Sequence, residues 1–406
     1  MSGSGGNSVV VGTRGSRLAL WQADFVAERL AAMRPGLEIR RTIIKTIGDR
    51  ILDTPLSKIG DKGLFTKELE AALLDGRIDI AVHSLKDLPT RLPDGLGIGA
   101  ILEREDPRDA LISLARTTLK DLPPGSRVGT SSLRRRSQIL ALRSDLEIVD
   151  LRGNVPTRIE RVEKGEMDAV VLAKAGVVRL GLGSKIVEVI DPDVILSAVG
   201  QGAIAIEIRG NDPRIPEILA PLDHFPTRLA VIAERALLRR LEGGCQIPIG
   251  ALGTLDREIL TLRGLVADLD GRRIIRAADS VDLLRAAAGV LAEFQGARSS
   301  PMPPDRPPGP AAAKTAPGEE GRPGDWRAFL GVHPDATARE TRAILTVMEK
   351  SAAALGDRLA QRLLDMGARP ILDAIISQAR PGHEPSGPTG PGGLGSSTDI
   401  DHEGKA

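Results

Sequence analysis

The residues of this chain best suited to bind a ligand are arginines placed where predicted strands end. They are Arg14 in "GTRGS", Arg134 and Arg135 in "GTSSLRRR", Arg152 in "LRGN", and Arg158 just beyond it. We expect them in loops at strand-to-helix junctions, where backbone N–H groups and a helix dipole attract anions. A guanidinium adds a forked donor that suits a carboxylate or a phosphate. Any one of them could be a solvated residue at a helix start, but their clustering at strand ends indicates an anion-binding pocket.

A carboxylate also follows a predicted strand. The stretch "IDIAVHSLKDLP" places Asp87 just past the strand, beside Lys86 and before Pro89. Ligands of open α/β sheets bind outside the carboxyl ends of strands, so Asp87 could act as an acid, a base or a stabiliser of a cation. A turn-forming Asp is the commoner use of "KDLP". We expect His83 to be a strand residue that faces the core.

Cys245, in "RRLEGGCQIPIG", is the only cysteine among 406 residues. It could be a nucleophile, a modified residue or a small buried hydrophobe, which is the commonest fate of a lone cysteine. A Cys–His hydrolase fits poorly, because neither His83 nor His224 lies in a recognisable base motif. One cysteine excludes an internal disulfide and favours a reducing compartment.

Composition narrows the function classes. Lys plus Arg number 55 and Asp plus Glu 54, and aromatic residues make up only 2%. A net charge of +1 with few stacking platforms argues against nucleic-acid binding and against a membrane surface as partner. The five histidines show no metal-ligand spacing, so no metal is predicted. The sequence contains neither a P-loop nor a GxGxxG motif, so phosphate is not favoured over carboxylate as the bound anion. With no signal peptide or membrane span in view, we expect a soluble, cytoplasmic protein.

Strand-like runs alternate with amphipathic helices over the first half of the chain, which predicts mostly parallel sheets covered by helices. One helix is expected over Arg17–Met33. A weak repeat relates "LEI" and "DGRIDIAV" to "LEI" and "KGEMDAVV". The first copy spans 42 positions (37 to 79) and the second 22 (146 to 168), so the first carries 20 more. The extra residues fall in segment 45–63, either a lid over a site or a decorative insertion.

The second half is organised differently. We expect the strand at 203–209 to return to the sheet of the first repeat. The chain would then cross twice between the two repeated units, and the two crossings would form a hinge. A helix at 226–241 and short strands near 249–254, 259–266 and 272–277 predict a small α+β domain. Residues 296–325 are rich in Pro and Gly and too poor in apolar residues to bury a core, and the tail after 379 is similar. Residues 337–375 have a helical pattern, with a break expected near Gly356 or Gly367.

Taken together, these stretches resemble the porphobilinogen deaminase family. The matching pieces follow the family's order from about residue 9 to 280: "TRGSRLALWQA", "ILDTPLSKIGDKGLFTKELE", "DIAVHSLKDLP", "EREDPRDALIS", "GTSSLRRRSQ", "LRGNVPTRI", "LSAVGQGA" and "LEGGCQIPIG". The resemblance implies two lobes like those of periplasmic binding proteins, with parallel-rich sheets, and a small α+β third domain. It implies a transferase that condenses four porphobilinogen molecules head to tail, with release of ammonia, into hydroxymethylbilane.

The resemblance also gives each candidate residue a role. Cys245 would carry a dipyrromethane cofactor through a thioether, as a tether and not as a turnover nucleophile. Asp87 would stabilise the cationic azafulvene that forms when ammonia leaves, and would help to move protons. Residues 45–63 would cover the cleft. The cofactor- and substrate-binding residues would be Arg14, Ser16, Lys58, Lys62, Ser84, Lys86, Thr130, Ser131, Ser132, Arg134, Arg135, Arg152, Arg158, Arg179 and Gln201.

The domain boundaries follow from the same comparison, with one departure. We expect domain 1 at 8–102 and 203–221, domain 2 at 103–202, and domain 3 at 225–285 and 352–378. The family's closing helix resembles residues 355–372 and arrives late, so an insertion is expected at 286–351, with a disordered tail at 379–406. We expect a monomer, with a possible transient hand-over of product to the next enzyme of the pathway. The alternative is an anion-binding carrier on the same scaffold, which would need neither Asp87 nor a modified Cys245.

Overall fold

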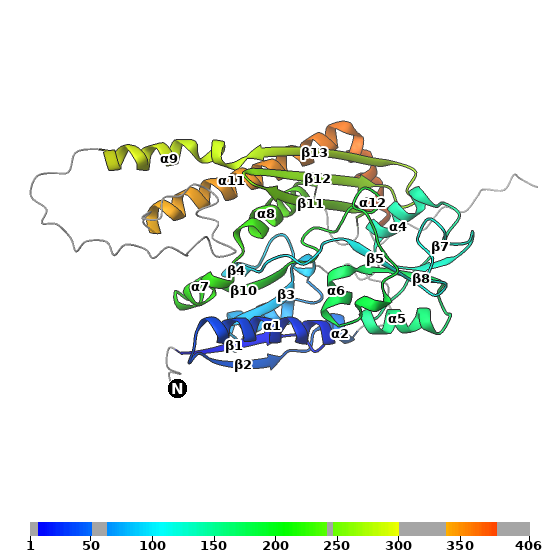
Figure 1. Cartoon of the computed structure of the whole chain (residues 1–406), viewed down its shortest axis with the longest axis horizontal. Helices are drawn as coiled ribbons and strands as arrows, with labels where there is room; N and C mark the ends of the chain where they lie inside the picture. The colour runs from blue at the N-terminus through cyan, green and yellow to red at the C-terminus, as the bar shows by residue number, and fades with distance from the viewer. Residues whose placement is uncertain (1–6, 51–62, 242–246, 300–337, 380–406) are drawn as a thin grey trace, which may run out of the picture.

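The computed structural model describes residues 7–50, 63–241, 247–299 and 338–379. Within them the chain forms two five-stranded sheets and one three-stranded sheet, with helices packed on their faces (Figure 1). The strands are β1 (Ser8–Thr13), β2 (Glu38–Ile43), β3 (Ile80–Ser84), β4 (Leu96–Ile101), β5 (Asp109–Ser113), β6 (Arg127–Gly129), β7 (Glu147–Val149), β8 (Ala169–Ala173), β9 (Glu188–Val189), β10 (Ile204–Arg209), β11 (Ile249–Asp256), β12 (Ile259–Ala267) and β13 (Ile274–Asp282). The longer helices are α1 (Arg17–Met33), α3 (Lys67–Leu74), α4 (Leu133–Leu142), α5 (Val155–Glu163), α8 (Phe225–Arg240), α9 (Leu283–Ser299), α11 (Ala338–Leu363) and α12 (Arg369–Ala379). The shorter ones are α2 (Ile47–Arg50), α6 (Lys174–Arg179) and α7 (Arg214–Leu219).

The two five-stranded sheets share one topology. Lobe 1 has the strand order β2-β1-β3-β10-β4, and lobe 2 has β7-β6-β8-β5-β9. In each lobe three neighbouring strands are parallel, and the fourth, β10 or β5, runs antiparallel to its neighbours. The weak sequence repeat is therefore confirmed as a repeat of strand order. The carboxyl ends of β1 and β3 meet at one edge of lobe 1 because the two strands are parallel.

Helix α1 has the bounds that its sequence predicts. Ser16 is extended and its hydroxyl accepts a hydrogen bond from Ala19 N, so it caps the helix start. Ala23, Val26 and Leu30 recur at helical spacing and are buried against the sheet of lobe 1. This cap fixes where the chain turns from β1 into the helix.

The chain crosses twice between the lobes, after β4 and before β10, and the crossings are hydrogen-bonded to each other. Leu102 N donates to Ile204 O over 3.0 Å, and Arg104 Nε donates to Gln201 O over 2.8 Å. Glu234 of α8, which is fully buried, accepts hydrogen bonds from Gly200 N and Gly253 N, each over 2.7 Å. One carboxylate thus joins a crossing to strand β11.

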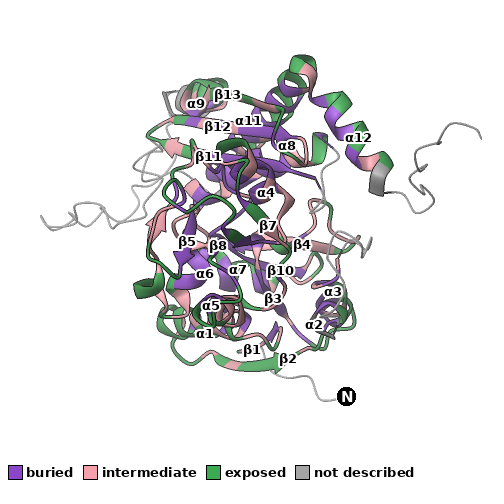
Figure 2. Ribbon diagram, turned by 90° about the vertical axis from the view of Figure 1, so that its right-hand side faces the viewer, coloured by how far each residue is buried: buried purple, intermediate pink, exposed green. Residues whose placement is uncertain are grey.

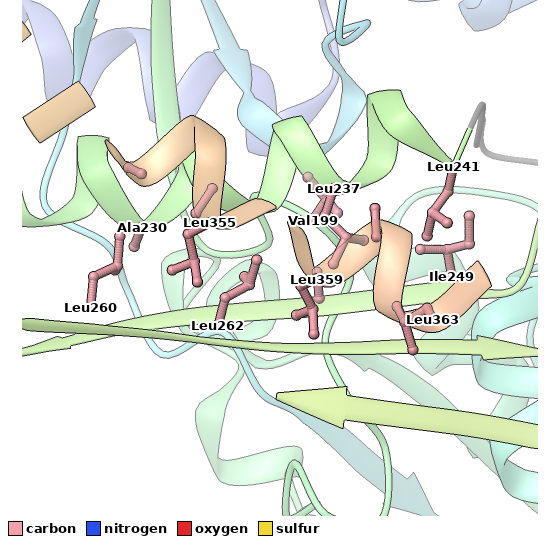
Figure 3. Close-up of a cluster of buried hydrophobic side chains, with 14 of the residues drawn as sticks. Val199, Ala230, Leu237, Leu241, Ile249, Leu260, Leu262, Leu355, Leu359 and Leu363 are labelled. Carbon is pink, nitrogen blue, oxygen red and sulfur yellow. The ribbon is translucent and has the colours of Figure 1, made fainter. Parts of the chain in front are cut away.

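A third sheet, β11-β12-β13, is antiparallel and carries α8 and α11 side by side on one face (Figure 3). Leu237 of α8, Leu359 of α11 and Leu262 of β12 are among the side chains buried between these layers. Helix α11 continues through Gly356, so the first of the two predicted positions for the break is wrong. A Cβ at Gly356 would lie 2.2 Å from Ala233 O, so glycine lets the two helices approach closely. The helical path is interrupted at Gly367, whose φ is 102°.

The buried cluster of this third domain reaches into residues for which an insertion at 286–351 was expected. Ala287 of α9, and Ile344 and Met348 of α11, are buried in it. They belong to the core because α9 and the first half of α11 pack together and extend the helical layer, as Figure 1 shows. Strand β13 also begins two residues later than expected and runs to Asp282. In Figure 2 buried residues concentrate along the central strands of the sheets, whereas the outer strands β2 and β13 contain none and the outer helix faces are exposed.

Candidate active site

Four predicted site residues line one pocket of lobe 1. Arg14 and Ser16 follow β1, Ser84 ends β3, and Asp87 ends the short 3-10 helix Leu85–Asp87. The pocket therefore lies at the carboxyl ends of two parallel strands, where the strand pattern predicted a ligand site. The side chain of Asp87 is exposed, and that of Lys86 is half-buried.

Two further residues of this pocket were missed from the sequence. Gln22 of α1 is only 2% exposed, and its Nε2 donates to Ser84 Oγ over 2.9 Å. Phe65 lies under Arg14, with 4.2 Å between the guanidinium carbon and the ring centroid. The sequence did carry a signal for Gln22, because it is a polar residue on the face of α1 that the apolar residues bury. Nothing local distinguishes Phe65.

Lobe 2 contributes arginines from helices, although loops were expected for most of them. Arg134 and Arg135 lie in the first turn of α4, because Ser132 caps that helix and accepts a hydrogen bond from Arg135 N. Arg158 lies within α5, and Arg179 is the last residue of α6. Arg14 and Arg152 do lie in loops.

A buried carboxylate that the sequence did not single out positions two of these arginines. Asp109 Oδ2 lies 2.8 Å from Arg134 Nη2, and its Oδ1 lies 2.8 Å from Arg135 Nη2. Gln201 Nε2 also donates to Asp109 Oδ1 over 2.9 Å. Burial raises the pKa of Asp109, but the two arginines outweigh burial and hold it far below its ordinary value. Arg134 also donates to Leu196 O over 2.6 Å.

The groups around Asp87 carry an excess of positive charge. Burial, opposed by Asp87 and helped by Arg135, lowers the pKa of Lys86 to about 8. Burial likewise lowers the pKa of Arg158 to about 10, helped by Arg135 and Arg152 and opposed by Asp87 among others. Cations that repel one another at a half-buried site favour a bound anion, which would relieve the repulsion.

Other predicted residues support the site between the lobes. Arg179 Nη2 donates to Gly202 O over 2.6 Å, and its guanidinium lies 5.6 Å from the ring centroid of Trp21 in lobe 1. Thr130 Oγ1 accepts from Ser132 N over 3.2 Å, and Ser131 Oγ donates to Leu151 O over 3.2 Å. These two hydrogen bonds order the loop from β6 to α4.

The remaining predicted residues, Lys58, Lys62 and Cys245, lie outside the described part of the chain. Among the residues that the structure does describe, no group of three His, Asp or Glu side chains is arranged to hold a metal ion. Across the same ranges, no helix combines the length and the apolar character that crossing a membrane requires.

Fold and site together define a class of protein. Two α/β lobes of similar strand order, joined by two chain crossings and followed by a small third domain, place basic and hydroxyl side chains around one exposed carboxylate. This is an arrangement for an anionic organic ligand, and the carboxylate gives it a group that could act on that ligand.

Comparison with known proteins gives the family. Residues 9–217 match the family model "Porphobilinogen deaminase, dipyromethane cofactor binding domain", and residues 228–288 match "Porphobilinogen deaminase, C-terminal domain". The chain is 55% identical over 268 residues to porphobilinogen deaminase of Pelotomaculum thermopropionicum, which covers 66% of this chain and 86% of the relative. It is 57% identical over 268 residues to that of Moorella thermoacetica, with the same coverage. The chain belongs to the porphobilinogen deaminase family.

Membership fixes the reaction. The protein is a transferase of tetrapyrrole biosynthesis that polymerises porphobilinogen into the linear hydroxymethylbilane, and its cofactor is dipyrromethane. Acetate and propionate groups on every pyrrole make both the cofactor and the growing chain polyanionic. The excess of arginine and lysine around Asp87 suits such a ligand.

Proposed function

We propose that the pocket lined by Arg14, Ser16, Ser84 and Asp87 is the place where each porphobilinogen is condensed, with Asp87 as the catalytic residue. The observation that carries this proposal is their convergence at the carboxyl ends of β1 and β3, facing the positive charges of lobe 2. A carrier of anions would need the arginines but would gain nothing from an exposed carboxylate among them.

Asp87 stabilises the cation that porphobilinogen becomes when ammonia leaves. The positive charge of that cation spreads onto the pyrrole nitrogen, whose N–H can donate to a carboxylate. At about 4 Å and an effective dielectric constant near 20, the attraction between the two charges is about 4 kcal/mol. A carboxylate at this place can also accept the proton that the pyrrole carbon loses when the new C–C bond forms.

The basic residues hold the carboxylates of the cofactor and of the growing chain. Lys86 and Arg158 fit a polyanion because burial, helped by the nearby charge of Arg135, disfavours their charged forms in its absence. Arg135 and Arg152 are proposed to bind the polyanion beside them. When bound, dipyrromethane supplies the pyrrole carbon to which the first porphobilinogen is added. Arg14, Arg134 and Arg179, with the hydroxyls of Ser16, Ser84, Thr130, Ser131 and Ser132 and the amide of Gln201, complete the proposed binding set.

Cys245 is proposed as the attachment point, since it is the only thiol in the sequence. Helix α8 ends at Arg240, five positions before it. Lys58 and Lys62 are proposed as further contacts to substrate carboxylates. We also propose that the enzyme works as a monomer in the cytoplasm and passes its product to the next enzyme of the pathway, which sedimentation, cell fractionation and coupled assays would test.

Two variants test the proposed roles together. Asp87→Asn keeps the size of the side chain and removes its charge, so we expect it to retain cofactor, measured by intact mass, and to turn over about a thousandfold more slowly. Cys245→Ser should instead fold without stable cofactor. An Asp87→Asn enzyme within tenfold of the parent rate would mean that Asp87 is a turn residue. Covalent dipyrromethane at full occupancy on Cys245→Ser would refute the attachment.

A further inference from the structure

The position of the Asp87 carboxylate is set by the backbone of its turn. The side chain is exposed, and within the described residues its carboxylate accepts no hydrogen bond. The turn begins where Leu85 N donates to Ala203 O over 3.0 Å, and it closes where Leu88 N donates to Leu85 O over 3.1 Å. Contacts that hold the residues on either side of Asp87 therefore also hold its carboxylate.

Helix α8 of the third domain packs against this turn. The helix lies between the third sheet and lobe 1 (Figure 1). Val231 of α8 is buried in one apolar cluster with Leu85 and Leu88. Because these two leucines lie on either side of the exposed Asp87, the third domain supports the turn from its buried side.

One helical turn after Val231, Arg235 reaches the backbone that follows Asp87. Its Nη1 donates to Leu88 O over 3.1 Å, and its Nη2 donates to Pro89 O over 2.6 Å. A guanidinium presents its N–H donors in a rigid fork, so two hydrogen bonds to successive carbonyls fix both the distance and the direction of this stretch of backbone. The side chain of Arg235 thus links the third domain to the two residues directly after Asp87.

Arg235 is a buried charge, and no carboxylate within the described ranges forms an ion pair with it. Its exposed fraction is 8%, and burial, helped by Arg239 and opposed by Glu207, lowers its pKa to about 10. The side chain is therefore charged at neutral pH, and a buried charge is costly unless hydrogen bonds compensate it. An apolar side chain would avoid this cost if α8 needed only to pack against lobe 1. The two carbonyl contacts are what an arginine adds at this position.

We propose that Arg235 is a positioning residue of the condensation reaction, which holds Asp87 at the reacting pyrrole through the carbonyls of Leu88 and Pro89. The proposal rests on the assignment of Asp87 under Proposed function. It gives the third domain a second task, because α8 also leads along the chain to the proposed attachment point Cys245, ten positions later (235 to 245). The helix that precedes the attachment point thereby also locates the catalytic carboxylate.

The first test is the steady-state rate of the Arg235→Gln holoenzyme, expressed per cofactor-bearing molecule as counted by intact mass. Glutamine keeps an amide donor but cannot bridge the two carbonyls. We expect kcat to fall by at least about tenfold, because a displacement of about 1 Å at a catalytic group can cost about a hundredfold in rate. KM should stay within about twofold, since other residues bind the substrate carboxylates. A smaller fall in kcat, or a loss that appears in KM instead, would overturn the proposal.

Arg228→Gln is the matched control. Arg228 also lies on α8 and also reaches a carbonyl of lobe 1, because its Nη2 donates to Gly99 O over 3.2 Å, but Gly99 belongs to the edge strand β4, two strands away from β3. Its Nε lies 2.7 Å from Asp223 Oδ2. Loss of this link weakens the contact between α8 and lobe 1 without touching the turn of Asp87, so kcat should stay within about twofold of the parent value. Equal losses of kcat in the two variants would make Arg235 a purely structural contact and refute the proposal.

A double-mutant cycle decides whether Arg235 acts through Asp87. In an Asp87→Asn background, Arg235→Gln should change the single-turnover rate by less than about twofold, because the carboxylate that it positions is absent. If the two substitutions instead slow the reaction by factors that multiply, Arg235 acts independently, and this proposal fails while the assignment of Asp87 stands. If Asp87→Asn is itself harmless, the proposed function of the pocket fails first. Arg235→Lys, which keeps the charge but not the fork, takes the same place in the cycle if Arg235→Gln does not fold, and its kcat should also lie below that of the parent.

Discussion

Replacing Glu234 by Gln tests whether one buried carboxylate holds the lobes and the third domain together. Its Oε1 accepts from Arg104 Nη1 over 2.6 Å and from Gly253 N over 2.7 Å, and its Oε2 accepts from Gly200 N over 2.7 Å. Every partner is a donor. A glutamine amide offers one oxygen, so its NH₂ group must face a donor whichever way it is turned. Arg104, whose side chain is 10% exposed, also loses its counter-charge.

Breaking a buried ion pair from one side typically costs about 3–5 kcal/mol, because the other charge stays buried. At about 2–4 °C per kcal/mol, the midpoint of thermal unfolding should fall by roughly 6–20 °C. Differential scanning calorimetry measures it. Glu160→Gln is the control, since Glu160 pairs with Lys164 on the exposed surface of α5, where solvent screens the pair and its loss changes stability little. A Glu234→Gln midpoint within about 2 °C of the Glu160→Gln midpoint would refute the reasoning.

Two further predictions follow from single residues. Because the pKa of Lys86 is lowered to about 8, the side chain loses its charge as the pH rises through that value, and kcat/KM for the anionic substrate should fall above about pH 8. Lys86→Arg keeps the charge and should remove this alkaline limb, and a limb unchanged in that variant would exclude Lys86 as its source. Gly356→Ala should lower the unfolding midpoint, because its Cβ would lie 2.2 Å from Ala233 O, whereas Gly289→Ala, with no atom within 4 Å, should raise it or leave it unchanged. Equal midpoints for the two alanine variants would show that α8 and α11 are not closely packed.

Local sequence patterns were enough to predict the helices and strands and the points where candidate site residues follow them. Helix α1 could be predicted to the residue because Ser16 supplies the cap and apolar residues recur at helical spacing behind it. Arg14 and Asp87 could be placed at strand ends because capping, periodicity and turn residues are properties of neighbours along the chain. The helix break at Gly367 was also predicted, as one of two candidate positions. Which of the two glycines interrupts the helix depended on the packing of α8 against Gly356.

Which charged residues become partners depends on the fold and not on local sequence. Arg104 and Glu234 are 130 residues apart in sequence, and Arg135 and Asp109 are 26 apart, so no local pattern pairs them. Nothing near His83 in the sequence announces that Glu207 will lie 3.0 Å away. Burial, counter-charges and the pKa values that follow from them depend on which strands become neighbours in a sheet and which helices cover them. Strand order and helix packing arise from contacts made across the whole chain, and for that reason the partners of the site residues emerged only with the fold.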